Sequence, residues 1–163
     1  WPYLYAGRFA EYAGNWYDVS RSVVQFNTGS ISPALPVQTA TMKFYVDAYK
    51  GGASVADLAV YELLKAWSED TVTWRKPWTV AGGDAVETPA GTTTIDKPDL
   101  GQWVTIDVTP LVQKWVANPA ANNGVLMRLI NPTASVQWRF PSSEYWFKDR
   151  VPTLSVTYMG VPE

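Results

Sequence analysis

Apolar and polar residues alternate along most of this chain, in short runs that turn residues separate. The alternation is clearest at residues 21–26, 42–47, 103–106 and 154–158. Glycine, proline and asparagine interrupt the pattern between these runs, for example at Gly51-Gly52 and Asn123-Gly124. A period of two over about five or six residues is typical of strands with one buried face. The pattern predicts an all-β protein, an antiparallel β-sandwich of jelly-roll type.

One segment departs from this alternation. Between residues 109 and 117 the apolar residues recur at helical spacing: Leu111, Val112, Trp115 and Val116. Thr109 is a good N-cap residue, and Pro110 suits the first helical position. Asn118-Pro119 then ends the pattern. We therefore predict one short helix over residues 109–117, covering one open end of the sandwich.

The alternation also predicts which side chains form the core. Residues on the inward parity of the strands, together with aromatic residues inside longer motifs, are expected to be buried: Val24, Phe26, Phe44, Trp67, Trp74, Ile106, Leu111, Trp115, Val156 and Tyr158.

Composition narrows the class of protein. A chain of 163 residues is the size of one domain, and we predict a single domain over residues 1–163. Within it, residues 1–16 are expected to form an extended N-terminal arm or an edge strand. A net charge of -2, with scattered lysines and arginines, argues against a nucleic-acid partner. No apolar run is long enough to span a membrane. The chain begins at Trp1 rather than Met, so it is either a processed protein or a fragment of a larger one, and we favour a processed, secreted or cell-surface protein.

Five motifs follow one another along the chain: R-S-V-V-Q-F at 21–26, W-S-E-D-T-V-T-W at 67–74, D-V-T-P-L-V-Q-K-W at 107–115, F-P-S-S-E at 140–144 and P-T-L-S-V-T-Y at 152–158. In this order they resemble the DNRLRE domain family of secreted and cell-surface proteins. Its disaggregatase-related members overlap with a family of carbohydrate-binding modules found on polysaccharide lyases. The resemblance covers residues 4 to 158 and implies a β-sandwich, an extracellular location and sugar binding.

Catalysis is not expected. The chain has no histidine and no cysteine, which removes the usual nucleophile–base pairs and transition-metal ligands. Glu69, Asp70 and Glu144 are the acidic residues inside motifs, but Glu69 belongs to a motif that the resembled family carries beside quite different enzymes. We interpret these carboxylates as structural and predict that Arg21 and Glu144 form a strand-edge ion pair or hydrogen-bond to loop amides.

No cofactor is expected, although the sequence leaves open whether the protein binds a structural calcium ion. Jelly-roll modules often hold Ca²⁺ through carboxylates and backbone carbonyls, which a sequence shows poorly. Asp18, Asp107 and Glu144 are conceivable ligands, but no D-x-D-x-D-G loop is present.

Aromatic residues are the main candidates for binding. The chain has nine tryptophans and nine tyrosines, and a flat π surface packs well against the C–H face of a sugar ring. Strand parity turns Tyr45, Trp103 and Arg139 outward, as a candidate carbohydrate-binding sheet face for an acidic or neutral polysaccharide. Trp78 and Trp146 form the alternative, a loop site. An ordinary solvated sheet face is the competing interpretation.

Two functions from different classes remain open. The first is a non-catalytic extracellular module that binds a polysaccharide or cell-surface glycan. The second is a structural subunit of a surface layer, filament or adhesin that self-associates through sheet edges. The aromatic segment at residues 1–16 motivates the second, because an extended apolar strand can add to the open edge of a neighbouring sheet.

Overall fold

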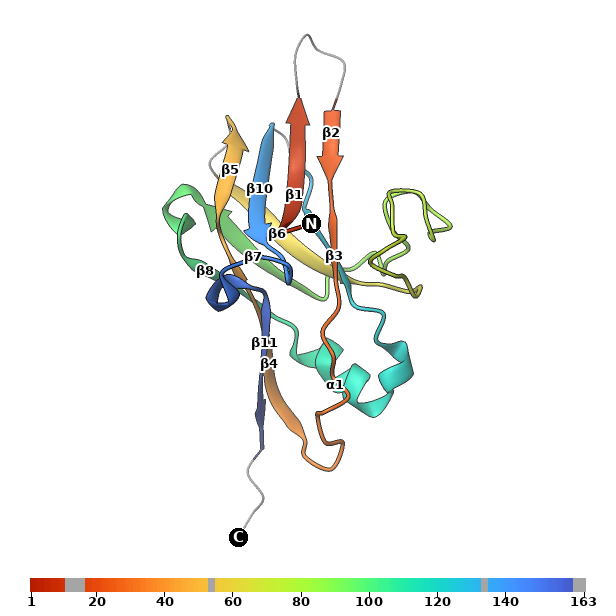
Figure 1. Ribbon diagram of the computed structural model, residues 1–163. Coiled ribbons are helices and arrows are strands. Elements are labelled where there is room, and N and C mark those ends of the chain that lie inside the picture. The colour runs from red at the N-terminus through yellow and green to blue at the C-terminus, as the bar shows by residue number, and fades with distance from the viewer. Residues whose placement is uncertain (11–16, 53–54, 133–134, 160–163) are drawn as a thin grey trace.

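The chain folds as an all-β sandwich (Figure 1). The computed structural model describes residues 1–10, 17–52, 55–132 and 135–159. One sheet has the strand order β2 (Tyr17–Ser20), β1 (Tyr3–Ala10), β10 (Val136–Pro141) and β5 (Ala48–Gly51). A second has the order β11 (Thr153–Tyr158), β4 (Val37–Tyr45) and β8 (Trp103–Asp107). The third has the order β3 (Ser22–Val24), β9 (Val125–Leu129), β6 (Val55–Glu62) and β7 (Gly91–Asp96).

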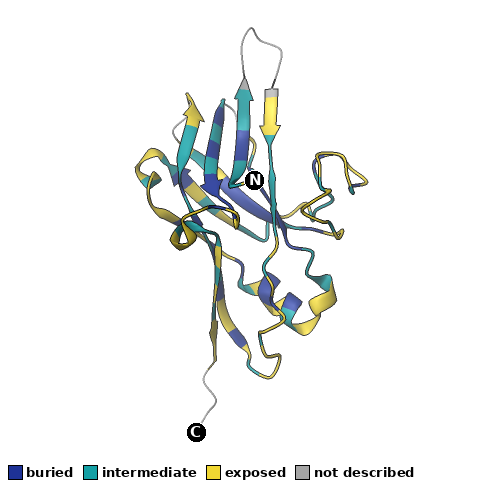
Figure 2. Ribbon diagram, in the orientation of Figure 1, coloured by how far each residue is buried: buried dark blue, intermediate teal, exposed yellow. Residues whose placement is uncertain are grey.

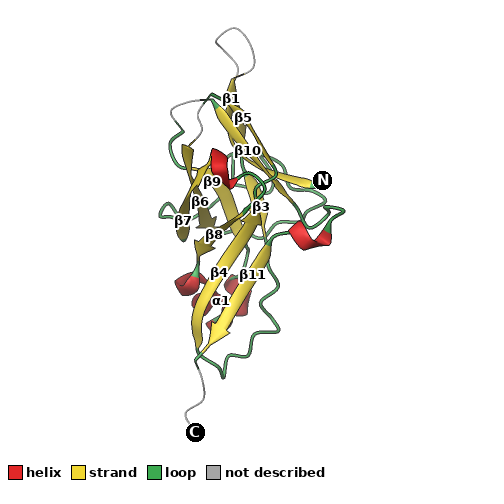
Figure 3. Cartoon of the chain, turned by 90° about the vertical axis from the view of Figure 1, so that its left-hand side faces the viewer, coloured by secondary structure: helices red, strands yellow, loops and turns green. Residues whose placement is uncertain are grey.

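All pairings are antiparallel, and the first two sheets adjoin along the chain that runs from β4 into β5. At this junction the N–H of Asp47 donates to the carbonyl of Arg139 at 3.0 Å, which ties the junction to β10. The third sheet forms the opposite layer (Figure 3), and the continuous segment from β2 to β3 connects the two layers (Figure 1). The predicted antiparallel β-sandwich is confirmed.

The main core lies between the layers, and Figure 2 shows its buried residues on both. Four predicted core residues are buried there, Phe44, Ile106, Leu111 and Trp115, while Val24, Phe26 and Val156 pack half-buried against it. The prediction is wrong for Trp74, which is 43% exposed, and for Tyr158, which is 38% exposed. Trp74 stands in a loop, where strand parity does not apply. Tyr158 follows a shift of register at the end of edge strand β11.

The single α-helix in the described part of the chain, α1, spans Thr109–Ala117, as predicted. It buries Leu111 and Trp115 against the core. Its start differs from the expectation, because the N-cap residue is Val108 and no side chain caps the helix. The hydroxyl of Thr109 instead accepts a hydrogen bond from the N–H of Ala40 at 2.9 Å, which fastens the helix to β4. No helix in the described ranges has the length and hydropathy needed to cross a bilayer.

A smaller core covers the outer face of the third sheet. The connection from β6 to β7 folds back over this face, so that loop and sheet side chains pack together: Ala59, Tyr61, Leu63 and Leu126 with Trp67, Val72, Trp78 and Ala85. Trp67, predicted as core, is half-buried in this second cluster, and its Nε1 donates to the carbonyl of Asn123 at 2.8 Å.

The N-terminal strand is an internal strand. β1 pairs with β10 over six residues, from Tyr3 to Arg8, and with β2 over four, from Gly7 to Ala10. β10 therefore covers one edge of β1 along residues 3–8 and β2 covers the other along residues 7–10, which corrects the expectation of a free arm or edge strand for residues 3–10. The remainder of the predicted 1–16 segment, residues 11–16, lies outside the described residues.

Candidate functional site: an aromatic platform

Aromatic and cationic side chains gather on the outer face of the layer formed by β1, β10, β4 and β8. We call this surface the platform, and its members are Tyr3 and Tyr5 on β1, Arg139 on β10, Tyr45 on β4, Trp103 on β8, and Tyr145, Trp146, Phe147 and Arg150 on the connection from β10 to β11. Each strand residue points outward because its sequence neighbours, such as Val104 and Phe140, point into the core.

One end of the platform is a cross-strand pair. Tyr45 and Trp103 stand directly opposite each other on β4 and β8. Their rings meet edge to face, with centroids 5.6 Å apart, a favourable arrangement for two aromatic rings. Trp103 remains 39% exposed. The pair is therefore both supported from one side and open to solvent from the other.

The other end of the platform is a loop that folds onto β1. Tyr145 is buried and packs against Tyr3 at a centroid distance of 5.5 Å. Trp146 packs 4.5 Å from Tyr145 and 6.0 Å from Tyr3. Trp146 is nonetheless 60% exposed and Phe147 is 53% exposed. Of the three neighbouring aromatic residues in this segment, one is therefore buried and two are exposed.

Arg150 joins the two ends. Its guanidinium lies 4.9 Å from the ring centre of Tyr45 and 5.4 Å from that of Phe147. Phe147 in turn contacts Trp146, at 6.3 Å between centroids. The sheet rings and the loop rings thus form one connected surface. Among the described residues, Arg150 has no carboxylate partner.

Arg139 supplies a fixed polar group beside the rings. Its Nε donates to the Asp47 carboxylate at 2.6 Å, and its guanidinium lies 4.3 Å from the ring centre of Tyr3. Desolvation lowers the pKa of Arg139, but the hydrogen bond and charge of Asp47 raise it by more, so the net shift is upward. Partial burial raises the pKa of Tyr3. Both groups therefore keep their usual protonation at neutral pH.

The structure unites the two sites that sequence reasoning kept apart. Tyr45, Trp103 and Arg139, predicted from sheet parity, and Trp146, predicted from the loop, all belong to the platform. Trp78 does not. It is only 8% exposed, its Nε1 donates to the carbonyl of Thr73 at 2.9 Å, and it packs in the second cluster on the opposite layer.

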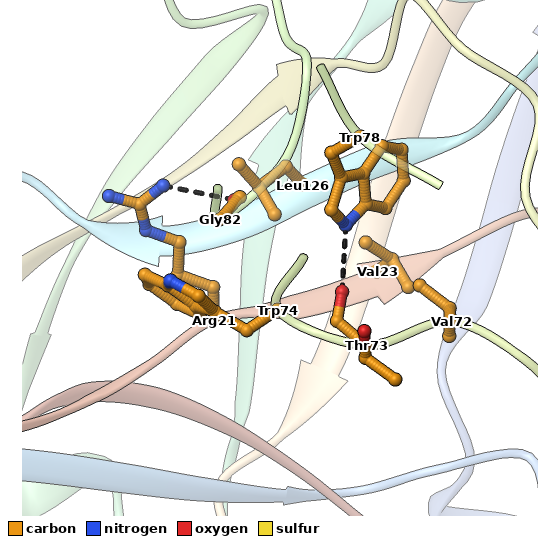
Figure 4. Close-up of a pocket in the computed structure, with 8 residues that line it drawn as sticks. All are labelled: Arg21, Val23, Val72, Thr73, Trp74, Trp78, Gly82 and Leu126. Carbon is orange, nitrogen blue, oxygen red and sulfur yellow. Dashed lines mark hydrogen bonds between the residues drawn. The ribbon is translucent and has the colours of Figure 1, made fainter. Parts of the chain in front are cut away.

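A hollow of about 220 Å³ lies beside Trp78 under the connection from β6 to β7 (Figure 4). Arg21 borders it, donating from Nη1 to the carbonyl of Gly82 at 3.0 Å and lying 5.0 Å from the ring centre of Trp74. The predicted partner of Arg21, Glu144, is elsewhere, and its N–H donates to the Ser142 hydroxyl. The prediction of an ion pair between Arg21 and Glu144 is therefore wrong. A hydrogen bond from Arg21 to the backbone of a loop, the other predicted possibility, is present.

The three conceivable calcium ligands do not come together. Asp18 lies on β2, Asp107 ends β8 and Glu144 follows β10. Within the described ranges no three acidic residues are grouped as metal ligands. Asp107 instead accepts a hydrogen bond from the N–H of Thr109 at 2.9 Å. A structural calcium ion therefore has no support from these residues.

Five platform residues were not among the predicted site residues: Tyr3, Tyr5, Tyr145, Phe147 and Arg150. Parity along β1 could have found Tyr3 and Tyr5, because Tyr3, Tyr5 and Phe9 all stand at odd positions and so share one face of the strand. The contribution of Arg150 depends on how a loop folds, for which the sequence has no periodic signal.

A comparison with models of protein families gives one match. The model described as carbohydrate-binding module family 96 matches residues 11–158, which includes every strand except β1. No curated protein gives a significant match to the chain.

Proposed function

The chain belongs to carbohydrate-binding module family 96, and we propose that its platform is the surface that binds carbohydrate. The observation that carries the proposal is the connected set of partly exposed rings with fixed cations between them. Three of its rings, Trp103, Trp146 and Phe147, keep between 39% and 60% of their surface exposed while packing on neighbours that hold them in place.

The platform offers both kinds of contact that a sugar needs. Trp103 and Trp146 supply flat apolar faces for the C–H groups of pyranose rings, and such rings lose little conformational entropy because they are already packed. Arg139, held by Asp47, supplies a directed donor for hydroxyl or carboxylate oxygens. Arg150 adds a second cation between the two aromatic ends. An acidic or a neutral polysaccharide could use this surface.

We also infer that the chain acts without catalysis and outside the cell. The absence of histidine and cysteine, and the lack of a grouped set of acidic ligands in the described ranges, support a binding role. Polysaccharides large enough to cover the platform are found mainly at and beyond the cell surface, which supports the location. Fractionation of the source cells, followed by detection of the chain, tests the location directly.

The test of the platform is affinity electrophoresis against acidic and neutral polysaccharides. The variants are Trp103→Ala and Trp146→Ala. We expect each to lose about tenfold or more in affinity, since stacking aromatics contribute about 1.4 kcal/mol or more at well-packed contacts. Tyr158→Ala is the matched control, because Tyr158 is 38% exposed, like Trp103, but lies at the end of β11 outside the platform.

The proposal fails if the wild-type protein binds a polysaccharide and both tryptophan variants, folded as judged by their thermal transitions, bind it equally well. Self-association through sheet edges stays a prediction beside this proposal. Light scattering coupled to size-exclusion chromatography checks it, and polymers that grow with protein concentration would favour a structural subunit.

A further inference from the structure

Two arginines stand side by side on the layer opposite the platform. The register of β3 and β9 pairs Ser22 with Met127 and Val23 with Leu126. One step further along the same register, Arg21 faces Arg128. Like charges placed directly opposite each other across a pair of strands destabilise a sheet. This arrangement therefore needs a compensating group.

No carboxylate in the described part of the chain supplies that group. Neither arginine forms an ion pair there. Burial lowers the pKa of Arg21, the charge of Arg128 lowers it further, and Tyr61 partly offsets both effects. The Nε of Arg128 is buried and has no hydrogen-bond acceptor among the described residues, while its guanidinium lies 4.3 Å from the ring centre of Tyr61.

One acidic side chain of the connection from β6 to β7, Asp84, is already engaged. The Asp84 carboxylate accepts hydrogen bonds from the N–H groups of Thr79 and Val80, at 2.8 Å and 2.7 Å. These bonds lower the pKa of Asp84, and the charge of Lys65 adds to the effect. Asp84 therefore serves to hold the loop in shape, and the two arginines stay without a counter-charge.

The hollow in Figure 4 opens beside Arg21. Its walls are aromatic and aliphatic at Trp74, Trp78 and Leu126, and polar at Arg21 and Thr73. Its volume of about 220 Å³ is below the roughly 300–1,000 Å³ of pockets for drug-sized ligands. The space suits a single ring-sized group. Trp74, which is 43% exposed, forms its rim.

We propose that this hollow is a second ligand site, which binds one sugar ring bearing an oxyanion, either a carboxylate or a sulfate ester, through Arg21, while Arg128, which faces Arg21 across the strands, adds its charge. A guanidinium has five N–H donors, and Arg21 gives Nη1 to Gly82, so donors remain for an anion. The anion neutralises two facing cations, and Trp74 packs against the ring that carries it. The site lies on the opposite layer from the platform and does not depend on it.

Binding is measured by isothermal titration with three probes: an oligosaccharide of uronic acids, the same oligosaccharide with its carboxyl groups reduced to alcohols, and a sulfated neutral oligosaccharide of equal length. The variants are Arg128→Gln and Trp74→Phe, with Trp103→Ala as the platform control. Arg128→Gln leaves the loop contact of Arg21 in place. The Trp74 indole N–H resonance, assigned by its absence in Trp74→Phe, reports occupancy of the hollow.

We expect the acidic probes to shift the Trp74 resonance, in wild type and in Trp103→Ala alike, and the reduced probe to leave it unshifted. In Arg128→Gln, the affinity of the acidic probes for the hollow should fall about tenfold, while the thermal transition of the protein stays cooperative. A stronger response to the uronate or to the sulfated probe identifies the anion. Equal shifts from acidic and reduced probes, no shift from any probe, or an undiminished shift in folded Arg128→Gln would each overturn the proposal. Loss of platform binding in Trp103→Ala does not affect the proposal for the hollow. The experiment can therefore reject the platform and the hollow independently of each other.

Discussion

Replacing three tryptophans by alanine, one at a time, distinguishes core rings from platform rings by the free energy of unfolding. Trp115 on α1 is fully buried, Trp103 is 39% exposed and Trp146 is 60% exposed. Because apolar area removed from water is the main source of stability, the loss should rank Trp115 first, Trp103 second and Trp146 last. Affinity for polysaccharide should fall about tenfold or more in the last two.

The magnitudes follow from the area that each ring buries. A large aromatic side chain buries up to about 250 Å², so Trp103 buries roughly 150 Å² and Trp146 roughly 100 Å². At about 25 cal/mol per Å² these areas correspond to upper bounds of about 4 and about 2.5 kcal/mol. A compact denatured state lowers both by roughly 10–40%, and alanine keeps part of the area. We expect about 2–3 kcal/mol for Trp103→Ala, about 1–2 for Trp146→Ala and about 3–5 for Trp115→Ala.

Urea unfolding followed by circular dichroism measures these differences, and an unchanged m-value shows that the folded and denatured states stay comparable. Domains of this size are stable by roughly 5–15 kcal/mol, so both platform variants should remain folded at room temperature. A loss for Trp146→Ala equal to that for Trp115→Ala would refute the reasoning, since it would place Trp146 in a core contact that the geometry does not contain.

Three further predictions test separate parts of the fold. Gly82→Ala should loosen the covering loop and lower the melting temperature, because Gly82 has φ +91° and an added Cβ would lie 2.6 Å from Nη1 of Arg21; Gly52→Ala, with open space around it, is the control. The hydrogen bonds that lower the pKa of Asp84 below 3.8 contribute stability that is present above pH 3.8 and lost as the pH falls through the lower folded pKa. Acid unfolding of Asp84→Asn should therefore be less steep than that of wild type, and identical curves would contradict this. Deleting residues 1–10 should abolish cooperative unfolding, since it removes an internal strand; a deletion variant with an unchanged thermal transition would show that β1 is dispensable.

Sequence reasoning succeeded where a repeating physical constraint acts on each residue. Strand parity identified Phe44 and Ile106 as core, and it also turned Tyr45 and Trp103 outward, because successive side chains of a strand face opposite sides. The helix at residues 109–117 was predictable to its ends, since Pro110 and Pro119 restrict where a helix can run. These features depend on local chemistry that the sequence displays directly.

The errors fall in the loops, where no period applies. Trp74 and Trp78 were assigned to the wrong environments: Trp74 was expected in the core and is exposed, and Trp78 was expected at the surface and is buried. The cause is the fold of the β6–β7 connection, which turns Trp78 onto the outer face of the third sheet. Trp74 instead packs against Arg21, a residue 53 positions earlier in the chain.

The two candidate sites share one construction. In each, a long connection folds over the outer face of a sheet and adds aromatic side chains to residues that the strands hold in register. On the platform, the connection from β10 to β11 brings Trp146 onto Tyr3. On the opposite layer, the connection from β6 to β7 brings Trp74 onto Arg21. The strands fix where each ligand would lie, and the loops fix which rings it meets. The choice of ligand in this protein should therefore depend on these two connections more than on the strand residues beneath them.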